Sequence, residues 1–128
     1  MTDRRGWFLD PEAGPIFQQI GDNVRRFLAR GDLRPGEKLP SARDLAGELR
    51  VNPNTVVHAY SELEGQGVLE TRRGLGSFVR EDAPVEGMRQ DLIRRAASRF
   101  AEEAVRLGLS KGEAIAAVKE VLDARTAR

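Results

Sequence analysis

Residues 39–79 read LPSARDLAGELRVNPNTVVHAYSELEGQGVLETRRGLGSFV, and this stretch decides the fold. It predicts two short helices separated by a turn of about three residues, followed by a hairpin with a glycine-rich tip. Ser41 is placed to cap the first helix, while Asn52 caps the second and Pro53 takes its first helical position. This order of elements is the outline of a winged helix-turn-helix.

The second of these helices has two chemically different sides. At about 100° per residue, one side collects the apolar residues, which we expect to be buried: Val56, Ala59, Tyr60 and Leu63. Asn54, His58 and Ser61 fall on the opposite side. A helix that is merely solvated usually carries lysine and glutamate there, so these small polar groups indicate a binding face.

Upstream of this stretch, apolar residues recur at helical spacing over residues 15–30. Pro15 is expected in the first helical position and Gly31 just past the end. Pro35 and Gly36 suit the central positions of a type II turn, and one short strand is expected at residues 37–39. Residues 1–13 are left as an N-terminal extension.

Downstream, the pattern predicts strands at residues 68–71 and 77–80 with RRGLG as the hairpin tip, and then a linker at 81–87. Two helices follow, broken at Gly108, and Ser110 with Glu113 forms a capping box that opens the second. Their apolar face is larger than two helices need against each other, so we expect it to form a dimer contact. The expected dimerisation residues are Leu92, Ala96, Phe100, Ala104, Leu107, Ile115, Val118 and Leu122.

Composition limits the function. The 128 residues include 21 basic and 20 acidic side chains. Any affinity for nucleic acid must therefore come from the local placement of a few arginines and from two copies acting together. Cysteine is absent, which suits a reducing cytoplasm. The amino-terminal apolar stretch is too short for a signal peptide, and no segment approaches the about 18 apolar residues of a membrane span.

The sequence offers little for catalysis or for a cofactor. With one histidine and no cysteine, a transition-metal site or a cysteine nucleophile is not expected. Gly74 and Gly76 lie between two strands and do not open a helix, so they do not form a phosphate loop. We therefore expect neither an enzyme nor a bound cofactor.

The first turn of the helix that begins near Asn52 is the part that this fold can place against base edges in the major groove. Asparagine pairs with adenine, arginine binds phosphate or guanine, and glycine lets the backbone approach the minor groove. The candidate contacts are Asn52, Asn54, Thr55 and His58 on this helix, Arg43 on the preceding helix, and Arg72, Arg73 and Gly74 at the hairpin.

Each candidate also has a simpler structural explanation. Asn52 caps its helix with or without DNA, and Arg43 can pair with a carboxylate on its own helix. Arg72 and Arg73 can keep a hairpin edge soluble, and His58 can be an ordinary surface histidine. The interpretation therefore depends on the order of the elements more than on any one side chain.

Residues 14–80 closely resemble the DNA-binding domain of the GntR family of bacterial transcription regulators. The matching pieces are PIFQQI, L.PGEKLPSARDLA, VNPNTV..AY.ELE..G and G.GSFV. VNPNTV and the short tail resemble the YtrA-like branch, whose C-terminal part is typically two helices used mainly for dimerisation. Pro53 and Val57 stand where many members of other branches carry arginines. The resemblance implies operator contacts by Arg43, Asn52, Pro53, Asn54, Thr55, Arg73 and Gly74.

The sequence thus predicts a mainly α protein with a small β-hairpin (α+β), with a winged helix-turn-helix domain at residues 14–80 and a two-helix dimerisation segment at 88–125. We expect a homodimeric transcription regulator, more a repressor than an activator, that binds double-stranded DNA at an inverted repeat. Two alternatives remain: a winged helix used for protein contact, and a metabolite-sensing domain in the C-terminal helices. A steep loss of binding with rising salt would favour DNA.

Overall fold

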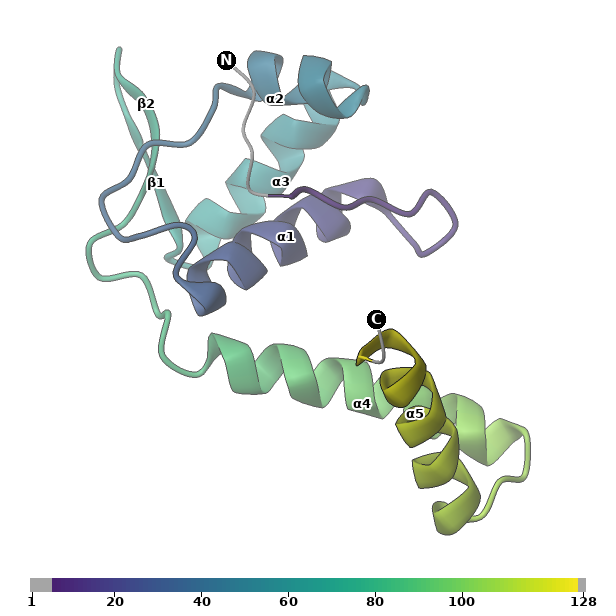
Figure 1. Ribbon diagram of the computed structural model, residues 1–128. Coiled ribbons are helices and arrows are strands. Elements are labelled where there is room, and N and C mark those ends of the chain that lie inside the picture. Colours follow the sequence, from purple (N-terminus) through teal and green to yellow (C-terminus); the bar gives the residue numbers. More distant parts are fainter. Residues whose placement is uncertain (1–5, 127–128) are drawn as a thin grey trace. The chain divides into compact units, whose positions relative to one another are not determined.

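The computed structural model describes residues 6–126 and divides the chain into two compact units, Met1–Arg89 and Gln90–Arg128. Figure 1 labels the elements in chain order. They are α1 (Ile16–Arg30), α2 (Ala42–Leu49), α3 (Pro53–Gly65), β1 (Leu69–Arg72), β2 (Gly76–Val79), α4 (Met88–Arg106) and α5 (Lys111–Thr126). The predicted fold class, mainly α with one small hairpin, is confirmed.

Helix α1 supplies one wall of the core of the first unit. It begins one residue later than predicted, because Pro15 takes the N-cap position with an extended backbone. Gly31 ends it in the left-handed region at φ 82°, as the sequence predicts. The buried face follows the helical repeat through Ile20, Val24, Phe27 and Leu28.

The helix-turn-helix forms as the sequence predicts. The N–H of Asp44 donates to Ser41 Oγ over 3.0 Å, and the N–H of Asn54 donates to Asn52 Oδ1 over 2.8 Å. Between the two helices, Arg50 adopts a left-handed conformation at φ 59°, which turns the chain sharply. The hydroxyl of Tyr60 donates to the carbonyl of Pro40 over 2.8 Å and ties α3 to the segment before α2.

The hairpin differs from the prediction by one residue in each strand. Leu69 pairs with Val79 and Arg72 pairs with Gly76, so Arg72 lies in β1 and only residues 73–75 form the tip. A hydrogen bond from Leu75 N–H to the Arg72 carbonyl, 2.8 Å long, closes this tight tip. The strand expected at residues 37–39 is reduced to a single bridge between Lys38 and Phe78.

The loop before α2 turns where predicted. The N–H of Glu37 donates to the Arg34 carbonyl over 3.1 Å, and Gly36 has φ 86°, as a type II turn requires. Gly36 also donates its N–H to the Val79 carbonyl over 2.8 Å, so this turn is joined to the end of β2.

Residues 6–14, which we name the N-terminal strap, are bound to α1 through the buried side chain of Asn23. Its Oδ1 accepts the N–H of Phe8 and its Nδ2 donates to the Phe8 carbonyl, both over 2.9 Å. Nδ2 also donates to the Gln19 carbonyl over 2.7 Å. The ring of Trp7 meets the ring of Phe27 edge to face, with centroids 5.0 Å apart.

Gln19 repeats this arrangement one turn earlier. Its Oε1 accepts the N–H of Asp10 and its Nε2 donates to the Asp10 carbonyl, both over 2.7 Å. Each amide thus imitates the paired hydrogen bonds of a neighbouring strand. The strap belongs to the first unit, although the sequence analysis set it apart as an extension. Residues 1–5 of that extension lie outside the described residues.

The segment expected to be a linker is not detached from the first unit either. Ala83 and Val85 are half-buried and pack against its core, and Met88 is buried there at the start of α4. Burial of these apolar side chains fixes residues 83–88 against the first unit.

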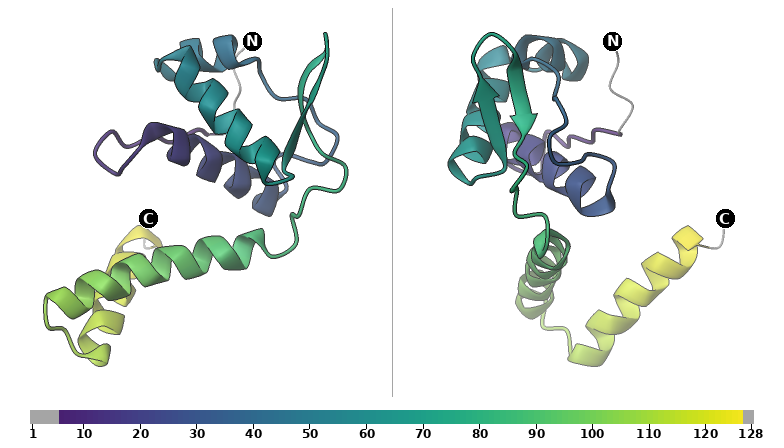
Figure 2. Two further views of the ribbon diagram at one scale, coloured as in Figure 1. Left: turned by 180° about the vertical axis from the view of Figure 1, so that it is seen from behind. Right: turned by 90° about the vertical axis from the view of Figure 1, so that its left-hand side faces the viewer.

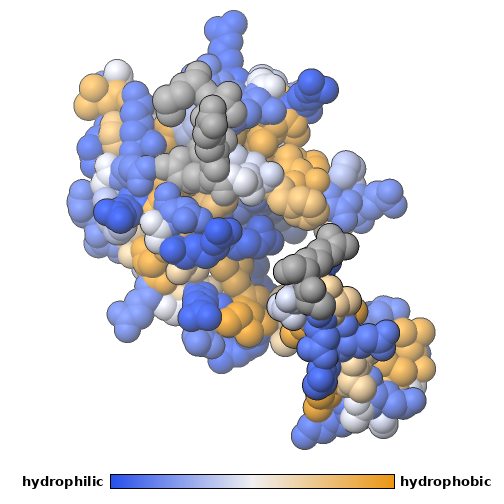
Figure 3. All heavy atoms as spheres, viewed as in Figure 1, coloured by the Kyte–Doolittle hydropathy of each residue, from blue (hydrophilic) through white to orange (hydrophobic). Residues whose placement is uncertain are grey.

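In the second unit, α4 and α5 diverge from the turn at Gly108, which has φ 74° (Figure 2). The apolar side of α5, which we expected to form a dimer contact, is exposed in the single chain, since none of its described residues is buried. Ala104 of α4 is buried, and the apolar residues of α5 line an open groove of about 800 Å³ between the helices. Figure 3 shows apolar side chains on the outside of this unit. Among residues 6–126, no helix combines the length and hydropathy needed to span a bilayer.

The capping box at the start of α5 makes the stability of this helix depend on pH. The backbone N–H of Ser110 donates to Glu113 Oε1 over 2.8 Å and lowers the pKa of that carboxyl, and the Ser110 hydroxyl lowers it further. The stabilisation is therefore complete above the ordinary pKa of glutamate and is lost as the pH falls through the lower, folded-state pKa.

We predict that an NMR titration will place the pKa of Glu113 below that of an unpaired glutamate. Ser110→Ala removes the hydroxyl and keeps the backbone N–H, so it should raise the pKa only part of the way. A Glu113 carboxyl that titrates at the ordinary value in the unaltered chain would contradict the prediction.

Candidate nucleic-acid interface

The elements that carry the candidate DNA contacts lie at one end of the first unit. The hairpin tip, α2 and the amino end of α3 are at the same end in every view of Figures 1 and 2. A duplex that meets this end can touch all three elements, which is how a winged helix-turn-helix docks.

The exposed face of α3 has the predicted polar residues. Asn54 and Ser61 are exposed, and Thr55 is half-buried. The Asn52 side chain accepts the N–H of Asn54, so its oxygen is already used as a cap. Pro53 is exposed at the first position of the helix, where it removes a backbone N–H that would otherwise face the ligand.

Arg43 projects from the first turn of α2 into solvent. Its guanidinium makes no ion pair or side-chain hydrogen bond within residues 6–126, so the alternative of a carboxylate partner on its own helix is not observed. Asp44, the neighbouring acid, stands at the capped start of the helix, where its charge suits the helix dipole. Within the described part of the chain, the donors of Arg43 are therefore available to a ligand such as phosphate.

The two arginines of the hairpin have different environments. The Nη2 and Nε of Arg72 lie 2.8 and 2.9 Å from Glu70 Oε2, and its guanidinium covers the ring of Phe78 at 4.1 Å. Arg72 therefore has a carboxylate partner on its own strand and a contact with Phe78 on the facing strand. Arg73 is exposed at the tip and makes no such pair within the described chain. Gly74 has φ 75° with open space around it.

His58 leans toward α1 and away from the centre of the exposed face. Its imidazole stacks on the ring of Phe17, with centroids 3.9 Å apart and planes 13° apart, and Nε2 lies 3.9 Å from Glu62 Oε1. One ring face is therefore covered, although the side chain is still about half exposed. This contact braces α3 against α1, a role that the sequence analysis did not consider.

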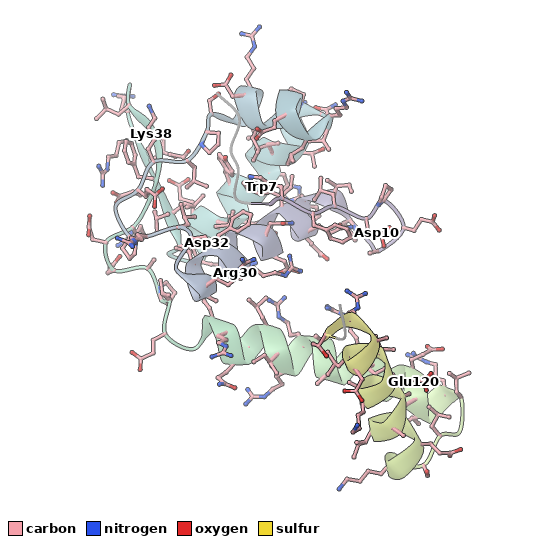
Figure 4. All side chains as sticks on the ribbon, in the orientation of Figure 1. Trp7, Asp10, Arg30, Asp32, Lys38 and Glu120 are labelled. Atoms are coloured by element: carbon pink, nitrogen blue, oxygen red, sulfur yellow. The ribbon has the colours of Figure 1, made fainter. Side chains whose placement is uncertain are left out.

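Two further residues at this end were not among the predicted contacts. Lys38 stands beside the hairpin (Figure 4), where a β-carbon on Gly76 would lie 3.0 Å from its Cε. Its place depends on the bridge to Phe78, a long-range pairing that a sequence pattern does not reveal. Val57, noted in the sequence only as a departure from other branches, is exposed on α3.

Nothing at this end suggests metal chemistry. In the part of the chain from residue 6 to residue 126, no three His, Asp or Glu side chains come together as ligands. The side chains that converge here are amides, hydroxyls and guanidinium groups, which form hydrogen bonds to bases and phosphates.

Comparison with known sequences identifies the family to which residues 16–79 belong. The sequence model described as "Bacterial regulatory proteins, gntR family" matches residues 16–79. The HTH-type transcriptional regulator YhcF of Bacillus subtilis is 42% identical over 106 residues, which are 82% of this chain and 88% of YhcF. The HTH-type transcriptional repressor YtrA of Bacillus subtilis is 45% identical over 76 residues, which are 59% of this chain and 58% of YtrA.

Solved structures agree. A GntR family transcriptional regulator from Listeria monocytogenes superposes with a TM-score of 0.72 and 35% identity, covering 87% of this chain and 98% of that one. The DNA-binding domain of AraR, in complex with operator ORX1, superposes with a TM-score of 0.51 and 27% identity, covering 56% of this chain and 90% of that one.

The family model spans α1, the helix-turn-helix and the hairpin. The relatives are regulators of transcription rather than enzymes. The resemblance proposed from VNPNTV and the hairpin is confirmed. The chain belongs to the GntR family of bacterial regulatory proteins, as a transcription regulator with a winged helix-turn-helix DNA-binding domain.

Proposed function

We propose that this chain is a cytoplasmic repressor that binds an inverted-repeat operator as a homodimer. The observation that carries the proposal is the set of groups at one end of the first unit: the amino end of α3, and Arg43 and Arg73, neither of which has a charged partner within residues 6–126. Two relatives support it, since YtrA is named a repressor and the AraR domain is seen with its operator.

The homodimer is proposed from the groove between α4 and α5. The groove holds about 800 Å³ and its walls carry Phe100, Val118 and Leu122, which are exposed in the single chain. An apolar surface of this kind is a protein contact site in most soluble proteins. A helix of a second copy supplies apolar residues of the same kind, and a two-fold arrangement lets each copy cover the other.

Dimerisation also compensates for the weak charge of the chain. The net charge is +1, and the recognition helix α3 carries no lysine or arginine. Among the described residues, each subunit brings Arg43 and Arg73 to the DNA without a charged partner of their own, so one domain alone has little affinity. Two linked domains gain affinity because the second binding event is intramolecular. Two-fold symmetry of the protein then calls for an inverted repeat in the DNA.

Selection of duplexes from a random DNA pool tests the proposal. We expect the selected duplexes to share an inverted repeat. The logarithm of the affinity should fall linearly with the logarithm of the salt concentration, with a slope of about −4, because Arg43 and Arg73 of each subunit in the dimer would each contact one phosphate. A chain that enriches no sequence and binds no duplex would contradict the proposal and favour the alternative of a protein-contact module.

Arg43→Ala should lower operator affinity by about 1 to 3 kcal/mol, because it removes a guanidinium that has no partner within the described chain. Fluorescence anisotropy at fixed salt measures this loss. Arg26→Ala is the matched control, since Arg26 is exposed on α1 and its loss changes the net charge equally. Equal affinities for the two variants would exclude a specific role for Arg43.

The hairpin arginines give a second contrast. Arg73→Ala should weaken operator binding by about 1 kcal/mol and lower the salt slope, with little effect on stability. Arg72→Ala removes the ion pair to Glu70 and the contact with Phe78, so its main effect should be on stability measured by urea denaturation. The assignment fails if the two variants exchange these effects.

A further inference from the structure

Val57 is an apolar side chain on the polar face of α3. It is 51% exposed, while its neighbours on that face are Asn54 and Ser61. It lies in the second turn of the helix, within the part that a major groove admits. It is absent from the buried core cluster and from the residues packed against that cluster, so core packing does not explain it.

The surroundings of Val57 form a shallow hollow of about 160 Å³ between α3, the start of α2 and the hairpin. Ala42 of α2 lines it opposite α3, and the other lining residues beside Val57 are Tyr60, Ser61, Glu64, Leu69, Thr71 and Ser77. Arg43 follows Ala42 directly, so this hollow adjoins a residue proposed to contact the DNA backbone. A small apolar group that projects from a base edge can enter here.

A duplex offers one such group in its major groove, the C5-methyl of thymine. We infer that Val57 determines sequence specificity by contacting a thymine methyl in each half-site, with Ala42 as the second wall. The inference rests on the proposed function, because it assigns a base to the same DNA-binding face. It goes further in naming an apolar contact where the polar residues of α3 supply hydrogen bonds.

The valine side chain suits this contact for a physical reason. A β-branched residue in a helix has one strongly preferred rotamer, so little side-chain entropy is lost when it meets the base. Cytosine carries only a hydrogen at C5, where thymine carries its methyl group, so cytosine would lose this apolar contact with the valine methyl groups. The contact therefore favours thymine and disfavours cytosine.

Replacement of single thymines by deoxyuridine tests the inference, since deoxyuridine lacks only the C5-methyl group. In the selected inverted repeat, each thymine of a half-site is replaced in turn, and affinity is measured by anisotropy at fixed salt. We expect one position where the replacement weakens binding about four-fold, and about fifteen-fold when both half-sites are replaced.

Val57→Ala should make the chain insensitive to that replacement while it still binds the operator. Phe8→Ala is the matched control: Phe8 is another exposed apolar residue of the first unit, in the N-terminal strap and outside the elements that carry the candidate contacts, so its loss should leave the thymine preference unchanged. Circular dichroism checks that both variants keep the helix content of the unaltered chain.

The outcomes separate the inference from the function on which it rests. Operator binding that tolerates deoxyuridine at every thymine overturns the inference and leaves the proposed function in place. A sensitive thymine that stays sensitive in Val57→Ala also overturns it, because another residue then makes the contact. Failure of the unaltered chain to bind any duplex overturns both.

Discussion

Replacing Ile115 with glutamate is expected to separate the proposed dimer and to lower the affinity for a full inverted-repeat operator about 100-fold. Ile115 is 58% exposed in the single chain and lines the groove between α4 and α5. A carboxylate there would have to lose its water in the dimer without a partner, which is costly. Sedimentation velocity measures the association, and anisotropy measures the DNA affinity.

Ala116→Glu is the matched control for this variant. Ala116 is the next residue of α5, is exposed, and lies outside the groove lining, so the variant has the same change of charge. We expect Ala116→Glu to remain a dimer with the affinity of the unaltered chain. Both variants should bind a single half-site equally. An Ile115→Glu chain that stays dimeric would show that the groove is not the contact.

Replacing Asn23 with alanine is expected to lower the free energy of unfolding by about 3 kcal/mol. The side chain is only 2% exposed, and its removal leaves the N–H and the carbonyl of Phe8 without their partner. The hydrogen bond to the Gln19 carbonyl is lost as well. Urea denaturation followed by the fluorescence of Trp7, the single tryptophan, measures the change.

Gln19→Ala provides the comparison, because Gln19 makes the same paired contact to Asp10 from a less buried position. Its cost should be about 1 kcal/mol, since water can replace hydrogen bonds that lie near the surface. If Asn23→Ala were no more destabilising than Gln19→Ala, the strap would not be a stabilising part of the first unit.

Local signals explain what the sequence predicted well. The caps at Ser41 and Asn52, the turn at Gly36 and the capping box at Ser110 each depend on residues within about four positions of one another. The buried side of α3 follows from helical periodicity alone, and the structure buries the residues that the sequence placed there.

Long-range pairing explains what the sequence did not predict. The strap depends on two amide side chains that bind backbone 9 and 15 residues away, and no periodicity marks such a contact. The hydrogen bond from Leu75 N–H to the Arg72 carbonyl closes the hairpin tip, so the limits of each strand differ by one residue from the predicted ones. The apolar side of α5 is exposed in the single chain because α4 and α5 diverge, an angle that no local pattern reveals.

The candidate interface shows the same division. The placement of Arg43 and Asn54 on exposed faces followed from their positions along two helices. The contact of Arg72 with Glu70 and Phe78, and the stack of His58 on Phe17, required the folded chain. The sequence therefore predicted which candidate residues are exposed, but it could not separate those that contact other side chains of the fold from those that have no partner among the described residues.

The scarcity of cations on α3 has a consequence for how the regulator finds its target on the chromosome. Helix α3 has neither lysine nor arginine, so contact with random DNA depends on a few side chains around it. Affinity for random DNA comes almost entirely from such charges, and sliding along the duplex needs it. This protein should therefore leave unrelated DNA quickly and search mainly by diffusion through the cell, with little of it held at the wrong sites.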